Sequence, residues 1–121
     1  MTESILIVDD DKICNFITLN AFKKAGLKNV FVAVNGDDAL KKLKEAEKFP
    51  DLILLDINMP VMNGFEFLEN YQKEGFEGQS KIVMYTSSIR ESEKKYSLQF
   101  KDVCDFVNKP ISREQIKAFI Q

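Results

Sequence analysis

Five short apolar segments recur along this sequence and set its fold class. Four of them are continuous, with no alternation of polar and apolar residues, which is typical of strands that helices cover on both faces. The five segments are ILIV (5–8), VFVAV (30–34), LILL (52–55), IVMY (82–85) and the weaker VCDFV (103–107). We therefore expect five strands, buried within a layered α/β fold.

Between these strands, mostly apolar residues recur at the spacing of a helix. They are Ile13, Phe16, Ile17, Asn20 and Ala21, then Ala39, Leu40, Leu43 and Ala46, then Phe67, Leu68 and Tyr71, then Ile89, Tyr96 and Phe100, and finally Ile116, Phe119 and Ile120. Gly26 follows the first helical segment, Gly36 opens the second, and Gly75 and Gly78 interrupt the chain before the fourth strand. Strands that alternate with helices predict a parallel sheet with right-handed crossovers. We expect one α/β domain over residues 1–121, large enough to bury a core without a disulfide or a structural metal.

The composition excludes several classes of function. The chain has no histidine, which rules out Ser-His-Asp and Cys-His catalytic pairs and the HExxH zinc motif. Its 17 basic and 19 acidic residues give a formal net charge of −2. The chain therefore lacks the basic excess that attracts nucleic acid or an acidic membrane, and we expect direct binding to neither.

The same sequence favours a cytoplasmic protein. The longest apolar run has five residues, far fewer than the ~20 that span a bilayer, and Glu3 stands where a secretory signal would be basic. Cys14 and Cys104 lie in apolar surroundings without the C-x-x-C spacing of a metal or redox site. We expect both to be buried, reduced thiols.

Charged and hydroxyl side chains follow four of the five predicted strands. In an open parallel sheet, the carboxyl ends of the strands converge at one edge. The residues there are Asp9, Asp10 and Asp11, then Asp56, then Thr86, Ser87 and Ser88, and finally Lys109. Asp9, Asp10 and Asp56 would repel one another unless a divalent cation neutralised them, and an oxygen-only set of ligands favours Mg²⁺. Asp11 is better explained as the N-cap of the first helix.

This combination of groups is suited to phosphoryl transfer. An ionised carboxylate can attack a phosphoryl group and form an acyl phosphate without a general base, which is consistent with the absence of histidine. Mg²⁺ and Lys109 would neutralise the negative charge of the transferred group, and Thr86 with the backbone N–H of Ser87 would donate hydrogen bonds to it.

The sequence resembles a known family, the response-regulator receiver domain of two-component signalling. The matching motifs are ILIVDDD (5–11), LILLDINMPVMNG (52–64), VMYTSS (83–88) and FVNKP (106–110), and they extend over nearly the whole chain. The resemblance implies a flavodoxin-like, doubly wound, five-stranded parallel sheet of order 2-1-3-4-5 with five helices.

The resemblance also assigns roles to the acidic residues. It implies that Asp56 is the phosphoacceptor, that Asp10 and Asp56 ligate Mg²⁺ directly, and that Asp9 acts mainly through water. The backbone carbonyl of Asn58 would complete the protein ligands, and Asn58 and Ser87 would also lie against the phosphoryl group.

A second set of roles concerns the switch. Lys109 would pair with the phosphoryl group, and its bond to Pro110 would be cis. Thr86 would move toward the phosphoryl oxygen and let Phe106 turn inward, where the family often has Tyr. A plain core phenylalanine at 106 is the alternative. The phosphoryl lifetime would depend on Asn58 and Ser88.

The partners follow from the same resemblance. The phosphodonor would be a sensor histidine kinase or a histidine phosphotransfer protein, because this chain cannot carry a phosphohistidine. A protein target, unidentified, would bind the face made by the fourth helix, fifth strand and fifth helix, around Arg90, Lys94, Lys95, Tyr96, Phe106 and Lys117. We expect a stand-alone regulator that catalyses only its own phosphorylation and slow autodephosphorylation.

Two other classes of protein share part of this pattern. A small phosphatase of the haloacid-dehalogenase type would use Asp9 and Asp11 as a D-x-D pair, but it leaves Asp56 unexplained and lacks a late acidic pair. A nucleotide-binding module would need a glycine-rich phosphate loop, and the five glycines form neither G-x-G-x-x-G nor G-x-x-x-x-G-K.

Overall fold

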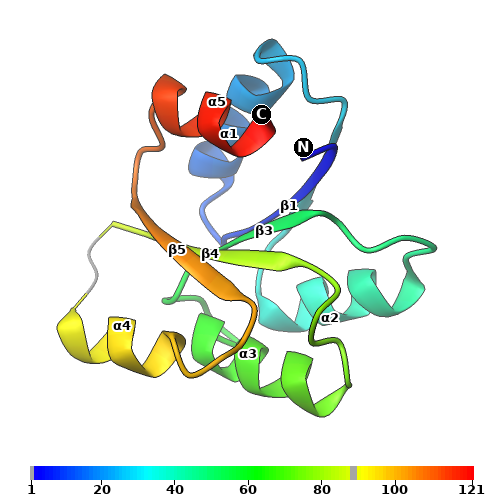
Figure 1. Ribbon diagram of the computed structural model, residues 1–121, viewed down its shortest axis with the longest axis vertical. Helices are drawn as coiled ribbons and strands as arrows, with labels where there is room; N and C mark the ends of the chain where they lie inside the picture. The colour runs from blue at the N-terminus through cyan, green and yellow to red at the C-terminus, as the bar shows by residue number, and fades with distance from the viewer. Residues whose placement is uncertain (1, 88–89) are drawn as a thin grey trace.

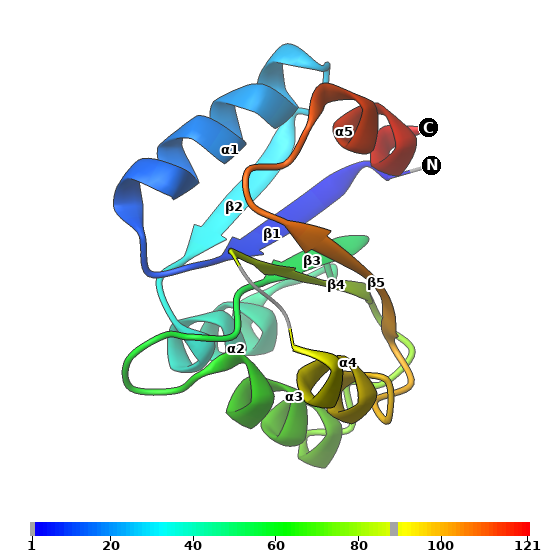
Figure 2. The same cartoon turned by 90° about the vertical axis from the view of Figure 1, so that its left-hand side faces the viewer.

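The computed structural model describes residues 2–87 and 90–121, which form a five-stranded parallel sheet between two layers of helices (Figures 1 and 2). The strands are β1 (Ser4–Val8), β2 (Asn29–Ala33), β3 (Leu52–Leu55), β4 (Lys81–Thr86) and β5 (Val103–Asn108). The helices are α1 (Lys12–Lys24), α2 (Gly36–Glu45), α3 (Gly64–Lys73), α4 (Glu91–Ser97) and α5 (Arg113–Ile120). The strand order β2-β1-β3-β4-β5 confirms the predicted fold class.

The sheet separates two apolar cores. Figure 2 shows α1 and α5 on one face of the sheet and α2, α3 and α4 on the other. Successive strand residues point to opposite faces, so Leu6 and Val8 join one core while Ile5 and Ile7 join the other. Helices on both faces bury both sets, which is why the strands read as continuous apolar runs.

Helix α1 forms where its apolar spacing predicted a helix, but the residues that gave this spacing are not the buried ones. Ile13, Phe16 and Ile17 are 75%, 69% and 59% exposed. The buried side chains of α1 are Asn15, Thr18 and Phe22. The Thr18 hydroxyl is hydrogen-bonded to the hydroxyl of Tyr85, which offsets the cost of burying it. Asn15 donates through Nδ2 to the carbonyl of Asp9, while its buried Oδ1 has no partner among the described residues.

Other local expectations have mixed outcomes. Gly26, Gly75 and Gly78 adopt positive φ in the turns after α1 and α3, as glycine permits. Both cysteines are free, but Cys104 is exposed and Cys14 only half-buried, so the expectation of two buried thiols is wrong. Ser88 and Ile89, named in the sequence analysis, lie outside the described residues. Among the helices of residues 2–87 and 90–121, none combines the length and apolar character needed to cross a membrane.

Candidate functional site

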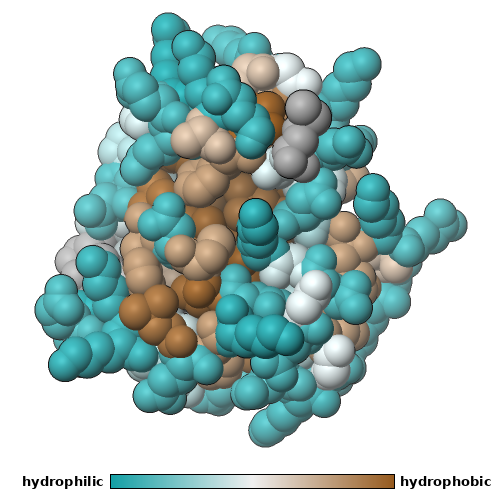
Figure 3. Space-filling view, in the orientation of Figure 1, coloured by the Kyte–Doolittle hydropathy of each residue, from teal (hydrophilic) through white to brown (hydrophobic). Residues whose placement is uncertain are grey.

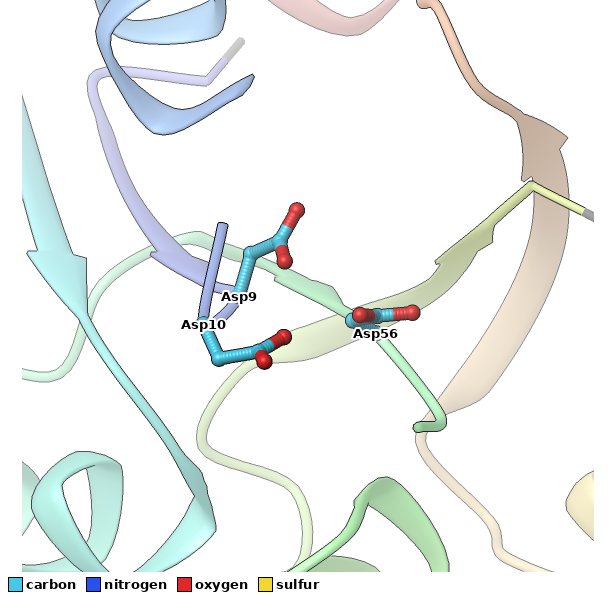
Figure 4. Close-up of side chains that lie close together, drawn as sticks. All are labelled: Asp9, Asp10 and Asp56. Carbon is cyan, nitrogen blue, oxygen red and sulfur yellow. The ribbon is translucent and has the colours of Figure 1, made fainter. Parts of the chain in front are cut away.

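Three carboxylates meet at the carboxyl ends of β1 and β3. Figure 4 shows Asp9 and Asp10 following β1 and Asp56 following β3, with the Asp10 carboxylate directed toward Asp56. One oxygen from each residue lies within 4.8 Å of the others. Asp9 and Asp56 are buried and Asp10 is exposed, so the cluster opens to solvent on one side.

Lys109 faces this cluster from the end of β5. Its Nζ donates a hydrogen bond of 2.6 Å to Oδ2 of Asp9 and lies 3.4 Å from Oδ2 of Asp56. Its backbone N–H donates to the carbonyl of Thr86 at 2.9 Å, which ties the end of β5 to the end of β4. The bond between Lys109 and Pro110 is cis, as the family resemblance predicted.

Burial and charge shift the pKa values at the centre of the site. Burial raises the pKa of the Asp56 carboxyl to about 6; Lys109 opposes this rise and Asp9 adds to it. Burial alone would lower the pKa of Lys109, but its hydrogen bond to Asp9 and the charge of Asp56 outweigh that effect, and the net shift is upward. Lys109 therefore stays charged, and the ionised form of Asp56 is less stable here than it would be in water.

The turn between β1 and α1 orients the first acidic pair. Asp11 is the N-cap of α1, as expected, and accepts hydrogen bonds from the backbone N–H groups of Ile13 and Cys14. Asn15 donates a 2.8 Å hydrogen bond to the carbonyl of Asp9. The carboxylate of Asp11 is thus engaged at the helix end, outside the acidic cluster, which removes the D-x-D pair that a phosphatase would use.

The loop after β3 brings the backbone of α3 directly against Asp56. A Cβ on Gly64 would lie 2.4 Å from the carbonyl oxygen of Asp56, so only glycine permits this approach. The N–H of Gly64 donates to the carbonyl of Ile57, and Asp56 Oδ1 accepts from the N–H of Ile57, both at 2.8 Å. Val61, exposed in the same loop, holds a φ of 69°.

Sequence reasoning missed these supporting residues. Asn15 has no sequence feature that distinguishes it from other polar helix residues, and its hydrogen bond to the Asp9 carbonyl depends on where β1 ends. The motif Asn63-Gly64 followed by Glu66 was a usable signal for Gly64, because it is a helix start, and Asn63 and Glu66 indeed form a capping box.

The remaining predicted residues lie on β4 and β5 or in the loops that follow β3 and β4. Thr86 is buried at the end of β4, next to β3 in the sheet, and Ser87 and Asn58 are exposed in the loops that follow their strands. Phe106 on β5 is half-buried against the core on the side of α2, α3 and α4, and Nζ of Lys94 on α4 lies 5.5 Å from the centre of its ring.

The donor set fits a hard divalent cation. The cluster offers only carboxylate oxygens, and the one ammonium group of Lys109 cannot neutralise three negative charges. Asp9, Asp10 and Asp56 could therefore hold Mg²⁺, with Asp10 on the open side.

Comparison with known proteins gives the family context. Residues 5–121 match the family model of the response regulator receiver domain. A protein-glutamate methylesterase/protein-glutamine glutaminase of Treponema denticola is 39% identical over 114 residues, which cover 91% of this chain and 29% of that protein. The sensor histidine kinase CheAY of Helicobacter pylori is 26% identical over 117 residues, covering 97% of this chain and 14% of the kinase. This chain thus spans less than a third of either relative.

The solved structures agree with the family match. The chemotaxis protein CheY4 of Vibrio cholerae has a TM-score of 0.83 to this chain at 27% identity, and the match covers 100% of this chain and 98% of that one. The shared fold extends over all five strands and five helices, so the acidic cluster lies at the carboxyl edge of a receiver-type sheet.

Proposed function

The chain belongs to the response-regulator receiver domain family of two-component signalling, and we propose that it accepts a phosphoryl group on Asp56 with the help of Mg²⁺. The observation that carries this proposal is the position of Asp56. Its carboxylate is buried at the sheet edge, shares a cluster with Asp9 and Asp10, and lies 3.4 Å from the ammonium of Lys109. A nucleophile, a site for a cation and a fixed positive charge thus converge on one carboxylate.

The proposed reaction is an in-line displacement at phosphorus. An oxygen of the ionised Asp56 forms the new O–P bond while the P–N bond to the donor imidazole breaks, and the electron pair goes to the imidazole nitrogen. Mg²⁺, when bound, neutralises charge on the phosphoryl oxygens. Lys109 binds a phosphoryl oxygen, and Thr86, the N–H of Ser87 and Asn58 lie around the same group.

Asp56 needs no base to become nucleophilic. Its pKa of about 6 leaves the carboxylate mostly ionised at neutral pH, and a bound cation would favour the ionised form further. A chain without histidine can therefore perform the acceptor half of the reaction.

We assign the donor half to a separate protein that carries a phosphohistidine, a sensor histidine kinase or a histidine phosphotransfer protein. The similarity of this chain to a segment of a sensor histidine kinase supports that pairing. The exposed residues Ile13, Phe16 and Ile17 lie in the first two turns of α1, which begins directly after Asp10 and Asp11. A donor protein that buried these three residues would therefore lie next to the acidic cluster.

The proposed output is a change at the face made by α4, β5 and α5. Figure 3 views the molecule from the side of β5, where apolar surface lies over β5 and toward α4 among hydrophilic side chains. Phosphorylation adds about −1.5 to −2 charges, which shift a conformational equilibrium only if the two states contact the phosphoryl group differently. Thr86 and Lys109 are the groups that could make this difference, and the half-buried Phe106, with Lys94 over its ring, could transmit it to a protein target.

The same site would hydrolyse the acyl phosphate slowly. Asn58 is exposed beside Asp56, and its small side chain would leave space for an attacking water. We therefore expect a bulkier residue at position 58 to lengthen the phosphoryl lifetime.

The proposal is tested with acetyl phosphate and Mg²⁺, followed by mass spectrometry of the intact chain and its peptides. We expect the wild-type chain to gain one phosphoryl group on Asp56 and Asp56→Asn to gain none. Phosphate on Asp9 in the variant, or rapid turnover of free phosphomonoesters by the wild type, would contradict the proposal and favour a phosphatase.

A further inference from the structure

The ring of Tyr85, one residue before Thr86 on β4, lies beside the ammonium of Lys109. The distance from Lys109 Nζ to the ring centroid is 5.2 Å, within the range of a cation–π contact. Tyr85 is 1% exposed. Lys109 therefore meets two carboxylates and one aromatic face, and the aromatic face is the only one of these three neighbours with no charge and no role as a metal ligand.

The hydroxyl of Tyr85 is fixed by helix α1. It lies 3.0 Å from the Thr18 hydroxyl and 3.5 Å from the Cys14 sulfur. Thr18 is 2% exposed, so this hydrogen bond forms away from water, and breaking it would leave buried polar groups unpaired. The contact also gives a reason why α1 buries Thr18 while Ile13, Phe16 and Ile17 stay exposed.

Lys109 needs such a restraint because its charge has two competing partners. A lysine side chain is a flexible four-carbon stem, and this one is closer to Asp9, at 2.6 Å, than to Asp56, at 3.4 Å. The ring of Tyr85 lies where it can restrict the stem to conformations that keep Nζ beside both carboxylates.

We propose that Tyr85 is a positioning residue, held by Thr18, that keeps Lys109 within reach of the phosphoryl group on Asp56. The effect of Tyr85 on phosphorylation rests on the proposed function, whereas the position of Lys109 over the ring does not. The proposal also makes α1 a support of the phosphorylation site through one hydrogen bond.

The placement is tested without any phosphodonor or metal. In NMR spectra of protein labelled with ¹³C-lysine, the ring should shift the ε-CH₂ protons of Lys109 upfield. We expect this shift in the wild type and in Tyr85→Phe, which keeps the ring, and its loss in Tyr85→Leu. A Lys109 signal that is the same in all three proteins would overturn the inference.

The consequence is tested by the rate of Asp56 phosphorylation with acetyl phosphate at saturating Mg²⁺. We expect Tyr85→Leu to slow it about five- to tenfold, and Tyr85→Phe and Thr18→Val, which lose only the hydrogen bond, about two- to threefold. Tyr71→Phe is the matched control, because the hydroxyl of this buried tyrosine bonds Asp102, away from Lys109. It should leave the rate unchanged.

A double-mutant cycle separates positioning from general support of the fold. If Tyr85 acts through Lys109, Tyr85→Leu should cause no further loss in a Lys109→Met background. Equal slowing in both backgrounds would overturn the inference. Should Tyr85→Leu fail to fold, Thr18→Val in the two backgrounds gives the same comparison with the core intact. A wild-type chain that takes up no phosphoryl group would contradict the proposed function, and the NMR comparison would still decide the placement.

Discussion

Nζ of Lys109 lies 2.6 Å from Oδ2 of Asp9 and 3.4 Å from Oδ2 of Asp56. The ammonium is thus paired most closely with a carboxylate that belongs to the candidate cation site. A cation bound to Asp9 would repel Lys109 from that carboxylate, and a phosphoryl group bound to Asp56 would attract it toward Asp56. The ion pair of the free chain therefore competes with Mg²⁺ and leaves Lys109 ready to exchange partners.

This competition predicts opposite effects of Lys109→Met on binding and on reaction. Removal of a positive charge in contact with the buried Asp9 should tighten Mg²⁺ binding about fivefold or more, because two unit charges about 4 Å apart interact by about 1 kcal/mol even in bulk water and by more inside a protein. The same variant should be phosphorylated more slowly, because the phosphoryl group loses its cationic partner. Isothermal titration with Mg²⁺ and acetyl phosphate kinetics measure the two effects.

Lys42→Met is the matched control. Lys42 pairs with Asp38 on α2, where both side chains are partly exposed, and it has no contact with the acidic cluster. We expect neither quantity to change. Mg²⁺ affinity in Lys109→Met equal to that of the wild type would contradict competition at Asp9.

Mg²⁺ binding should weaken as the pH falls through about 6. The pKa of Asp56 is raised to about 6, so a proton and the cation compete for the same carboxylate below that pH. One pH unit below the pKa, the apparent affinity should fall about tenfold. Titrations at several pH values measure this, and Asp56→Asn should show a flat profile over the same range. A flat wild-type profile would show that Asp56 does not ligate the cation.

Asp56→Asn should stabilise the metal-free chain at neutral pH. The pKa of Asp56 is raised from 3.8 to about 6, so the folded chain binds this proton more tightly than the unfolded chain does. Its contribution to stability is fully present below pH 3.8 and is lost as the pH rises through about 6. The neutral asparagine avoids this loss, and we expect a gain of about 1–3 kcal/mol in the free energy of unfolding at pH 7.

Denaturant unfolding in EDTA, at pH 7 and again near pH 4, measures that difference. The stability gain of Asp56→Asn should shrink toward pH 4, where the wild-type carboxyl is protonated. Saturating Mg²⁺ at pH 7 should reverse the order of stability, because it should stabilise only the wild type. A variant less stable than the wild type at pH 7 would contradict the prediction.

The sequence predicted which side chains meet at the sheet edge because strand ends are easy to locate. All five apolar runs end within one residue of the ends of the observed strands β1 to β5, and parallel topology brings those ends to one edge. Asp9, Asp10, Asp56 and Lys109 meet there as a direct consequence. The role of Asp11 as an N-cap was also predictable, because it depends only on local geometry.

Features that depend on packing between distant elements were not predictable. The spacing of Ile13, Phe16 and Ile17 identifies a helix but does not say which face meets the sheet. Tyr85 on β4 provides a buried hydroxyl, and that partner makes Thr18 a residue of the buried face. The pairing joins two residues 67 positions apart, and no local pattern contains it.

The close approach of α3 to Asp56 predicts that Gly64→Ala disturbs the site. A Cβ at position 64 would lie 2.4 Å from the Asp56 carbonyl oxygen and 3.0 Å from the Ile57 Cα, and both are backbone atoms that cannot simply rotate away. We expect a loss of about 2–4 kcal/mol in stability and slower phosphorylation of the molecules that remain folded.

Gly75→Ala separates the two effects. Gly75 has φ of 78° and no heavy atom within 4 Å of an added Cβ, so the variant should lose about 1 kcal/mol through backbone strain and keep its phosphorylation rate. Equal rates in folded Gly64→Ala and wild type would show that the backbone next to Asp56 adjusts without consequence.

The unusual orientation of α1 predicts that its two phenylalanines differ sharply. Phe22 is fully buried and Phe16 is 69% exposed. Phe22→Ala should cost about 3–5 kcal/mol in the free energy of unfolding, while Phe16→Ala should change it by less than about 0.5 kcal/mol. Urea unfolding measures both, and a large loss in Phe16→Ala would contradict the exposure of this face.

An unchanged free energy of unfolding in Phe16→Ala would mean that folding does not require the apolar stripe of Ile13, Phe16 and Ile17. A stripe of this kind next to Asp10 then has its most direct explanation in the docking of the phosphodonor, and Phe16→Ala should slow transfer from a phosphohistidine protein while acetyl phosphate reacts as before.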